Sequence, residues 1–253
     1  MSAKYKSPSF LLPNELNTST NPSLSEDKAS MYSMDFDGSN SINCGNISLL
    51  NGLTKATWSC WYKKTASGAK YFMGTWASGQ KQFLPYQYSS GMEVYMANSA
   101  GTQQTMFSNL SCGISQNTWH HFAFVYNEAE SSNSDKLKFY LNGTQITNNG
   151  AGAALTSLNT VTADFILGAP FTPSLTGNLD EVAIFNRALN TTEIAALYGG
   201  TSPNIYPSNL MATNLNPIVY YPLGEQAQNS GYLSASGNTW QFPNGVLQDY
   251  VMD

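Results

Sequence analysis

The feature that most constrains the fold is a series of short segments in which hydrophobic residues alternate with other residues. In residues 57–62, the side chains of Trp58, Cys60 and Tyr62 share one face of an extended chain. Residues 119–126 alternate in the same way, but both of their faces are largely apolar. That pattern predicts a central strand in a sheet covered on both sides. Many short strands separated by turn signals predict an all-β sandwich or barrel.

A second local signal predicts a β-hairpin. Residues 137–141 run into Asn142-Gly143, and residues 144–146 follow directly. Asn-Gly between two alternating runs favours a type I′ turn, because both turn positions need positive φ. Further strands are predicted at residues 165–168, 179–185 and 218–224.

One short helix is predicted after residue 190. Asn190 is a good N-cap, and Glu193 stands where a capping box needs an acceptor. Gly199 and Gly200 end the helical pattern. We expect this helix to cover an edge of the sandwich rather than to carry the function.

Composition excludes several classes of protein. The formal net charge is −5, only 11% of residues are charged, and Arg187 is the sole arginine. A basic face for nucleic acid is therefore missing. No apolar run is long enough to insert into a membrane as a helix. The three cysteines, Cys44, Cys60 and Cys112, fit neither a disulfide framework nor a zinc site, so we expect free thiols.

Residues 1–31 predict an extended N-terminal arm. They are rich in Pro, Ser, Thr and Asn, and such a stretch cannot bury enough surface to fold alone. Phe10, Leu11 and Leu12 form its apolar cluster. The stretch is either a disordered tail or an assembly arm that docks this cluster on a neighbour. We find no signal-peptide pattern and expect synthesis in a reducing cytosol.

Four blocks, in this order, resemble the laminin-G-like, concanavalin-A-like jelly-roll family. They are residues 34–39 (MDFDGS), 57–64 (TWSCWYKK), 119–126 followed by 139–143, and 177–189 followed by Glu193-Ile194 and Leu197-Tyr198. The resemblance covers residues 32–200. It implies an all-β, two-sheet antiparallel jelly-roll sandwich with about six or seven strands in each sheet.

The C-terminal part allows two interpretations. Residues 201–216 predict a linker, and residues 217–253 a C-terminal extension. We favour the start of a second jelly roll in this extension, because residues 250–253 (YVMD) echo residues 32–35 (YSMD). The alternative is that residues 218–221 fold back and complete the first sandwich.

Some members of the family that the chain resembles are glycoside hydrolases, but we expect that this protein is not an enzyme. Those enzymes need two carboxylates that flank one glycosidic bond. The closest spacing is Glu128-Ala129-Glu130, in a polar loop-like stretch. The enzyme motif has an aspartate between its two carboxylates, and this chain has Ala129 there. His120 and His121 are adjacent on a strand and point to opposite faces, so they cannot share a metal or a reaction.

The resemblance also suggests a calcium site. It points to Asp37 in the first turn and Asp180 in the last strand, with Asp35 as an alternate, because these strands are often neighbours in such folds. Carboxylates and loop carbonyls are ligands that Ca²⁺ prefers. The alternative is that Asp37 is only a turn residue and Asp180 an edge carboxylate.

Four aromatic residues are candidates for stacking on a glycan. Trp76, Tyr86, Tyr88 and Tyr95 lie in or near residues 70–100, which we expect to have loop character. Aromatic rings stack on sugar faces, while amides and hydroxyls bind the sugar edges. The alternative is that these rings are ordinary core residues.

The whole chain also looks similar to structural proteins of tailed phages. These are rich in Asn, Ser and Thr and often carry laminin-G-like modules. The resemblance implies a non-enzymatic virion surface protein, a fibre or capsid decoration, made in the host cytoplasm. Its arm would bind other virion proteins, its jelly roll would bind host glycans, and it would form a homo-oligomer, a trimer in a fibre. The alternative is an extracellular carbohydrate-binding module of a larger cellular protein.

Overall fold

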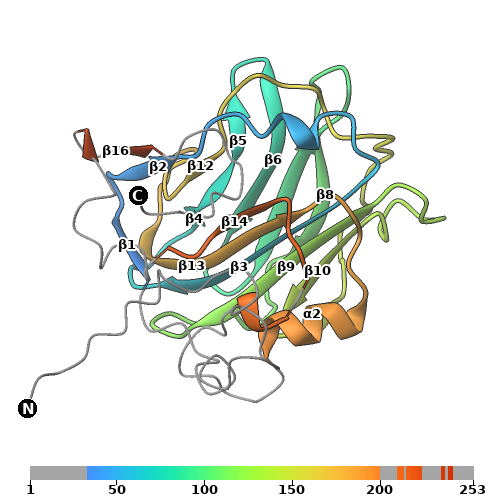
Figure 1. The fold of residues 1–253 in the computed structure, drawn as a ribbon. Helices are drawn as coiled ribbons and strands as arrows, with labels where there is room; N and C mark the ends of the chain where they lie inside the picture. Colours follow the sequence, from blue (N-terminus) through green and yellow to red (C-terminus); the bar gives the residue numbers. More distant parts are fainter. Residues whose placement is uncertain (1–32, 200–209, 214, 224–234, 237–238, 242–253) are drawn as a thin grey trace, which may run out of the picture.

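The computed structural model describes residues 33–199, 210–213, 215–223, 235–236 and 239–241. Within these ranges the chain forms two β-sheets that pack face to face (Figure 1). All strand pairs are antiparallel except the pair formed by β16 and β2. The predicted all-β sandwich is confirmed.

Seven strands form the first sheet. Their order is β1 (Met34–Asp37), β13 (Thr176–Phe185), β3 (Lys55–Lys64), β9 (His120–Asn127), β10 (Leu137–Leu141) and β11 (Thr144–Ile146), with β14 (Val219–Tyr221) also paired to β13.

Nine strands form the second sheet. Their order is β15 (Ala235–Ser236), β16 (Thr239–Gln241), β2 (Ser41–Asn43), β12 (Ile166–Leu167), β5 (Met73–Ala77), β6 (Gln80–Gln87), β7 (Met92–Ala97) and β8 (Gln103–Asn109), with β4 (Lys70–Tyr71) also paired to β6. The helical elements are η2 (Ser48–Leu50), α2 (Thr191–Tyr198) and η3 (Leu210–Thr213).

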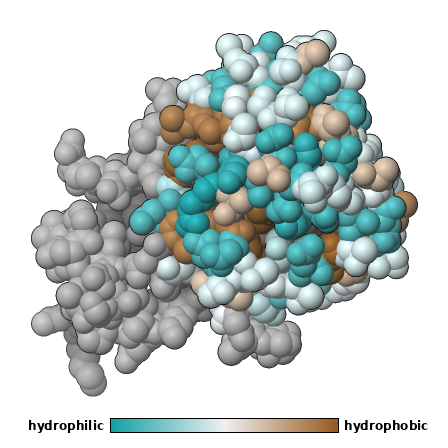
Figure 2. Space-filling view, turned by 90° about the vertical axis from the view of Figure 1, so that its right-hand side faces the viewer, coloured by the Kyte–Doolittle hydropathy of each residue, from teal (hydrophilic) through white to brown (hydrophobic). Residues whose placement is uncertain are grey.

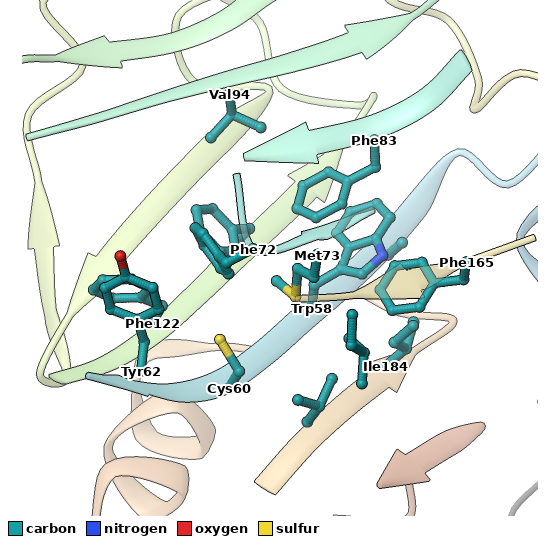
Figure 3. Packing of buried hydrophobic residues seen from close by; sticks show 14 of the residues in the cluster. Trp58, Cys60, Tyr62, Phe72, Met73, Phe83, Val94, Phe122, Phe165 and Ile184 are labelled. Atoms are coloured by element: carbon teal, nitrogen blue, oxygen red, sulfur yellow. The ribbon is translucent and has the colours of Figure 1, made fainter. Parts of the chain in front are cut away.

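The core between the sheets is aromatic. Trp58 from β3 stacks on Phe83 from β6, with ring centroids 4.1 Å apart and planes 4° apart. Cys60 and Tyr62 lie on the same side of β3, in the same buried cluster (Figure 3). This is the face that alternation predicts for residues 57–62.

β9 is covered on both sides. Phe122 and Phe124 face the core between the sheets, whereas Ala123 and Val125 belong to a second buried cluster. The second cluster includes Ile194 of α2 and therefore lies between that helix and the outer face of the seven-stranded sheet (Figure 1). The prediction of a central strand covered on both faces is confirmed.

The predicted turn and cap are also confirmed. Asn142 and Gly143 join β10 to β11 with φ of 51° and 76°. Asn190 accepts a hydrogen bond from the Glu193 amide, and the Glu193 carboxylate accepts one from the Asn190 amide. Gly199 ends α2 in the left-handed conformation.

The expected loop character of residues 70–100 is wrong. This stretch contains β4, β5, β6 and β7. Pro85 lies inside β6, but β4 pairs with residues 86–87 and β5 with residues 80–83, so neither pairs with Pro85. A proline is tolerated there because no ladder hydrogen bond on that side requires its missing N–H.

The segment after α2 returns to the first sheet. In β14, Val219 pairs with Ile184 and Tyr221 with Val182. The side chains of Val219 and Tyr221 are buried in the core between the sheets. This is the arrangement expected if residues 218–221 complete the first sandwich. Residues 250–253, and Phe10, Leu11 and Leu12 of the arm, lie outside the described residues.

The described surface matches the uncharged, polar composition. The side of the molecule shown in Figure 2 is mostly hydrophilic, with small hydrophobic areas between polar ones. In the described ranges, no helix is long and apolar enough to cross a membrane.

Candidate functional site

The candidate site is a group of half-buried aromatic rings on the outer face of the nine-stranded sheet. Phe83 of β6 and Val94 of β7 point into the core. Residues at the opposite parity therefore point outward, which places Tyr86 and Tyr95 on the outer face. We call the rings of this face the aromatic shelf: Tyr71, Trp76, Tyr86, Tyr88, Tyr95 and Phe171.

Four rings of the shelf form a connected series, and Trp76 and Tyr95 form a separate pair with ring centroids 6.5 Å apart. Tyr71 of β4 stacks on Tyr86 of β6 with a centroid distance of 4.1 Å. Tyr88 meets Tyr86 edge to face at 4.6 Å, and Phe171 meets Tyr71 edge to face at 5.4 Å. Phe171 is 49% exposed, which leaves an apolar ring at the surface.

A carboxylate holds two of these rings in place. The hydroxyls of Tyr88 and Tyr95 donate to Glu93 Oε2 at 3.1 and 2.5 Å, and Ser108 Oγ donates to Oε1 at 3.2 Å. Desolvation, followed by the nearby Glu93 charge, raises the pKa of both tyrosines. Both phenols therefore stay protonated and act as donors at neutral pH.

A pocket of about 410 Å³ opens beside the shelf. Its lining consists of Tyr71, Trp76, Ala77, Ser78, Lys81, Leu84, Tyr95, Gln103 and Phe171. Lys81 holds its ammonium 5.2 Å from the centroid of the Trp76 ring. This volume falls within the usual range for small-molecule sites. Flat rings, a hydroxyl, an amide and an ammonium can together bind a ligand with both apolar faces and polar edges.

The four predicted aromatic residues lie on this one surface. Trp76 and Tyr95 line the pocket, and Tyr86 and Tyr88 continue the shelf from it. Whether they bind a glycan stays a prediction. Sequence reasoning missed Tyr71, Lys81, Glu93 and Phe171. The alternation of Glu93 and Tyr95 could have shown that these two share a face, but nothing local marks Phe171.

The structure does not bring Asp37 and Asp180 together. β1 and β13 are neighbours, but Asp37 pairs with Thr176, four residues from Asp180. At about 3.3 Å per residue, this separates the two positions by about 13 Å along the strand. Asp180 is fully buried, and its Oδ1 accepts a hydrogen bond from the Glu181 amide. One calcium ion shared by this pair does not fit that register.

Asp37 has a structural role in its turn. Its Oδ1 accepts hydrogen bonds from the Ser39 hydroxyl, the Ser39 amide and the Asn40 amide, which lower the pKa of Asp37. The alternate, Asp35, accepts a hydrogen bond from Asn178 Nδ2. Among the described residues, no three His, Cys, Asp or Glu side chains gather as metal ligands. Calcium binding by this protein stays a prediction.

The remaining titratable candidates are engaged in structural contacts. His121 is fully buried, and its Nε2 shares a 2.9 Å hydrogen bond with Ser59 Oγ. Desolvation lowers the pKa of His121 to about 3, so the ring is neutral. His120 lies on the opposite face of β9 and bonds to Ser115 and Asn142.

The two glutamates with hydrolase-like spacing lie after β9, not along a strand. Glu128 forms an ion pair with Lys136 at 3.9 Å, and Glu130 one with Lys138 at 2.8 Å. Neither residue lines the pocket beside the shelf.

Two antiparallel sheets face to face, with a polar and aromatic outer surface, define a lectin-like β-sandwich. The model of the concanavalin A-like lectin/glucanases superfamily, Laminin_G_3, matches residues 36–195, and the chain belongs to this family. No curated protein matches the sequence.

Solved structures share this fold at low sequence identity. A heptameric SAP-like pentraxin from Limulus polyphemus superposes with a TM-score of 0.52 and 14% identity, over 77% of this chain and 93% of the pentraxin. A protein from Bacteroides ovatus, to which carbohydrate binding is ascribed, gives a TM-score of 0.52 and 14% identity over 83% of this chain. The matched part is 54% of that protein. These likenesses show the fold alone.

Proposed function

We propose that this protein is a non-enzymatic binding protein that holds a saccharide against the aromatic shelf. The observation that carries the proposal is the pocket of about 410 Å³ whose lining includes Trp76, Tyr95, Tyr71 and Phe171. Most large aromatic side chains of the described sandwich are buried, whereas these rings keep part of their surface in water. Partly exposed rings next to polar groups suit the apolar C–H faces and hydroxyl edges of a sugar.

The test compares two tryptophans in similar surroundings. Trp76 and Trp119 each lie under a lysine ammonium, at 5.2 and 5.0 Å, but Trp119 directly precedes β9, a strand of the other sheet. The affinities of wild type, Trp76→Ala and Trp119→Ala for a panel of neutral and acidic polysaccharides are measured by affinity electrophoresis and calorimetry. We expect Trp76→Ala to weaken binding about tenfold, which corresponds to about 1.4 kcal/mol, and Trp119→Ala to bind like wild type. Equal binding by all three proteins, or no binding by wild type, would reject the shelf as the site.

We further propose that the protein works on a virion surface, as a fibre or capsid decoration made in the host cytoplasm. Support comes from the resemblance to tailed-phage structural proteins and from the low charge of the sequence. The arm of residues 1–31 would then bind other virion proteins, and the chain would assemble as a homo-oligomer. Co-sedimentation with capsid or tail proteins in the native source, identified by peptide mass spectrometry, is the expected result. A chain free of virion proteins would instead favour an extracellular lectin-like module.

A further inference from the structure

The pocket beside the shelf carries one charged side chain in its lining, Lys81. Lys81 is the second residue of β6 and pairs with Trp76 of β5, and its ammonium lies 5.2 Å from the Trp76 ring centroid. Across the described residues, no carboxylate lies within ion-pair distance of Lys81. The lysine is half-buried, so its ammonium remains within reach of a ligand.

The carboxylate on the same face does not neutralise this charge by contact. Glu93 is absent from the pocket lining, and its oxygens accept hydrogen bonds from Tyr88, Tyr95 and Ser108. The hydrogen bonds from these three hydroxyls fix the Glu93 carboxylate among the side chains of the shelf. A ligand in the pocket therefore meets aromatic rings and a cation.

The net negative charge of the chain bears on how an anionic ligand could bind. The formal net charge is −5, which disfavours non-specific attraction of a polyanion. An acidic saccharide that binds must therefore be recognised by a local group, and an ammonium that faces an anion forms a charge-assisted hydrogen bond.

We propose that the saccharide held by the aromatic shelf is acidic, and that Lys81 binds its carboxylate or sulfate group. This inference rests on the proposed saccharide binding and names the ligand class of the same site. The sugar ring packs on the shelf next to Trp76, and the anionic substituent points to the Lys81 ammonium. The contact between Lys81 and the Trp76 ring keeps the ammonium in place, because a cation over an indole face is itself favourable.

The test uses pairs of polymers that share a sugar backbone and of which one is anionic and the other neutral. The full chain is titrated with polygalacturonate and with its fully methyl-esterified form, and separately with dextran sulfate and dextran. We expect at least tenfold tighter binding to one acidic polymer than to its neutral partner. The pair that shows this preference tells whether the carboxylate or the sulfate is the natural group.

Three variants assign the preference to Lys81. Lys81→Gln should lose the preference for the acidic polymer, and Lys81→Arg should keep most of it. Lys63→Gln is the matched control, because Lys63 lies 5.0 Å from the Trp119 ring centroid on the other sheet, and it should bind like wild type.

The outcomes separate the inference from the proposed function. If acidic and neutral polymers bind equally and Trp76→Ala weakens both, saccharide binding stands and the acidic class is wrong. If Lys81→Gln and Lys63→Gln weaken binding equally, general electrostatics explains the effect and the Lys81 contact is rejected. If wild type binds none of the polymers at millimolar sugar, the proposed function is rejected, and this inference with it.

Discussion

At the scale of single residues, Glu93 is a positioning residue for the shelf, because it orients Tyr88 and Tyr95 without lining the pocket. In Glu93→Gln the negative charge beside the two phenols is lost. We expect the tyrosine titration to shift to lower pH and saccharide affinity to fall several-fold. Spectrophotometric titration and calorimetry measure the two effects. Ser108→Ala, which removes a donor and leaves both tyrosine contacts, is the control and should keep the wild-type titration.

His121 makes the stability of the fold sensitive to acid. Burial lowers its pKa to about 3, whereas the same side chain in the unfolded chain titrates near its ordinary value of 6.5. Between these two pH values the unfolded chain binds more protons, so the free energy of unfolding falls as pH falls. The slope from one such group is at most about 1.4 kcal/mol per pH unit. Urea unfolding at pH 7.5, 6, 5 and 4 measures it, and His121→Gln should flatten it. His120, whose pKa burial also lowers, accounts for part of the remaining slope.

Residue-scale reasoning from sequence succeeds where the signal is local. Adjacent histidines on a strand must face opposite ways, and the structure confirms that His120 and His121 do. The grouping of Lys81 with Tyr95 and Phe171 in one pocket could not be predicted. It depends on the register of two strands and on a distant loop, none of which leaves a pattern in neighbouring residues.

At the scale of elements, a variant of the α2 N-cap tests whether this helix only covers the seven-stranded sheet or also contributes to binding. Asn190→Ala removes the side-chain acceptor for the Glu193 amide. The loss of such a cap costs about 1 kcal/mol. We expect the urea midpoint to fall accordingly while saccharide affinity stays unchanged, because the shelf lies on the other sheet. A clear loss of affinity in Asn190→Ala would mean that α2 contributes to binding.

Gly74 is the residue in β5 that permits close pairing with β6. Its φ is +146°, and a Cβ there would lie 2.3 Å from the Phe83 carbonyl oxygen. Gly74→Ala should destabilise the fold by about 2 kcal/mol or more, since both strain and a backbone clash oppose it. Gly79→Ala, where φ is +69° and nothing lies within 4 Å of the new Cβ, should cost about half as much. Similar melting of the two variants would contradict this account of the β5–β6 pairing.

The strands that were predicted from the sequence and those that were missed differ in how clearly neighbouring residues indicate a strand. β3, β9 and the β10–β11 hairpin carry clear alternation or an Asn-Gly turn, and they were predicted. β5 and β6 lie in residues 70–100, which we expected to have loop character, and Gly74, Gly79 and Pro85 in or beside them are residue types common in turns. Their pairing is stabilised by neighbours in the sheet rather than by the strands' own residues, and this tertiary effect overrides local preference.

At the scale of the whole molecule, the sandwich extends beyond the part that the family model matches. The match ends at residue 195, but β14 pairs with β13 and buries Val219 and Tyr221 in the core between the sheets. Burial of each such side chain contributes about 1.5–3 kcal/mol. A strand edge left without β14 would also expose unpaired backbone groups. The segment after α2 therefore stabilises the same domain that carries the shelf.

A comparison of two shortened chains tests this. We expect a chain of residues 1–223 to melt close to the full chain, and a chain of residues 1–199 to melt at least 10 °C lower or to aggregate, because it lacks β14. Thermal unfolding followed by circular dichroism and light scattering distinguishes the two. Val219→Asp in the full chain gives the same test without truncation, since it places a charge where the valine side chain is fully buried. If the 1–199 chain melts with the 1–223 chain, β14 adds nothing to the cooperative unit. The sandwich would then be complete at α2, and residues 210–223 would be a separate addition to its edge.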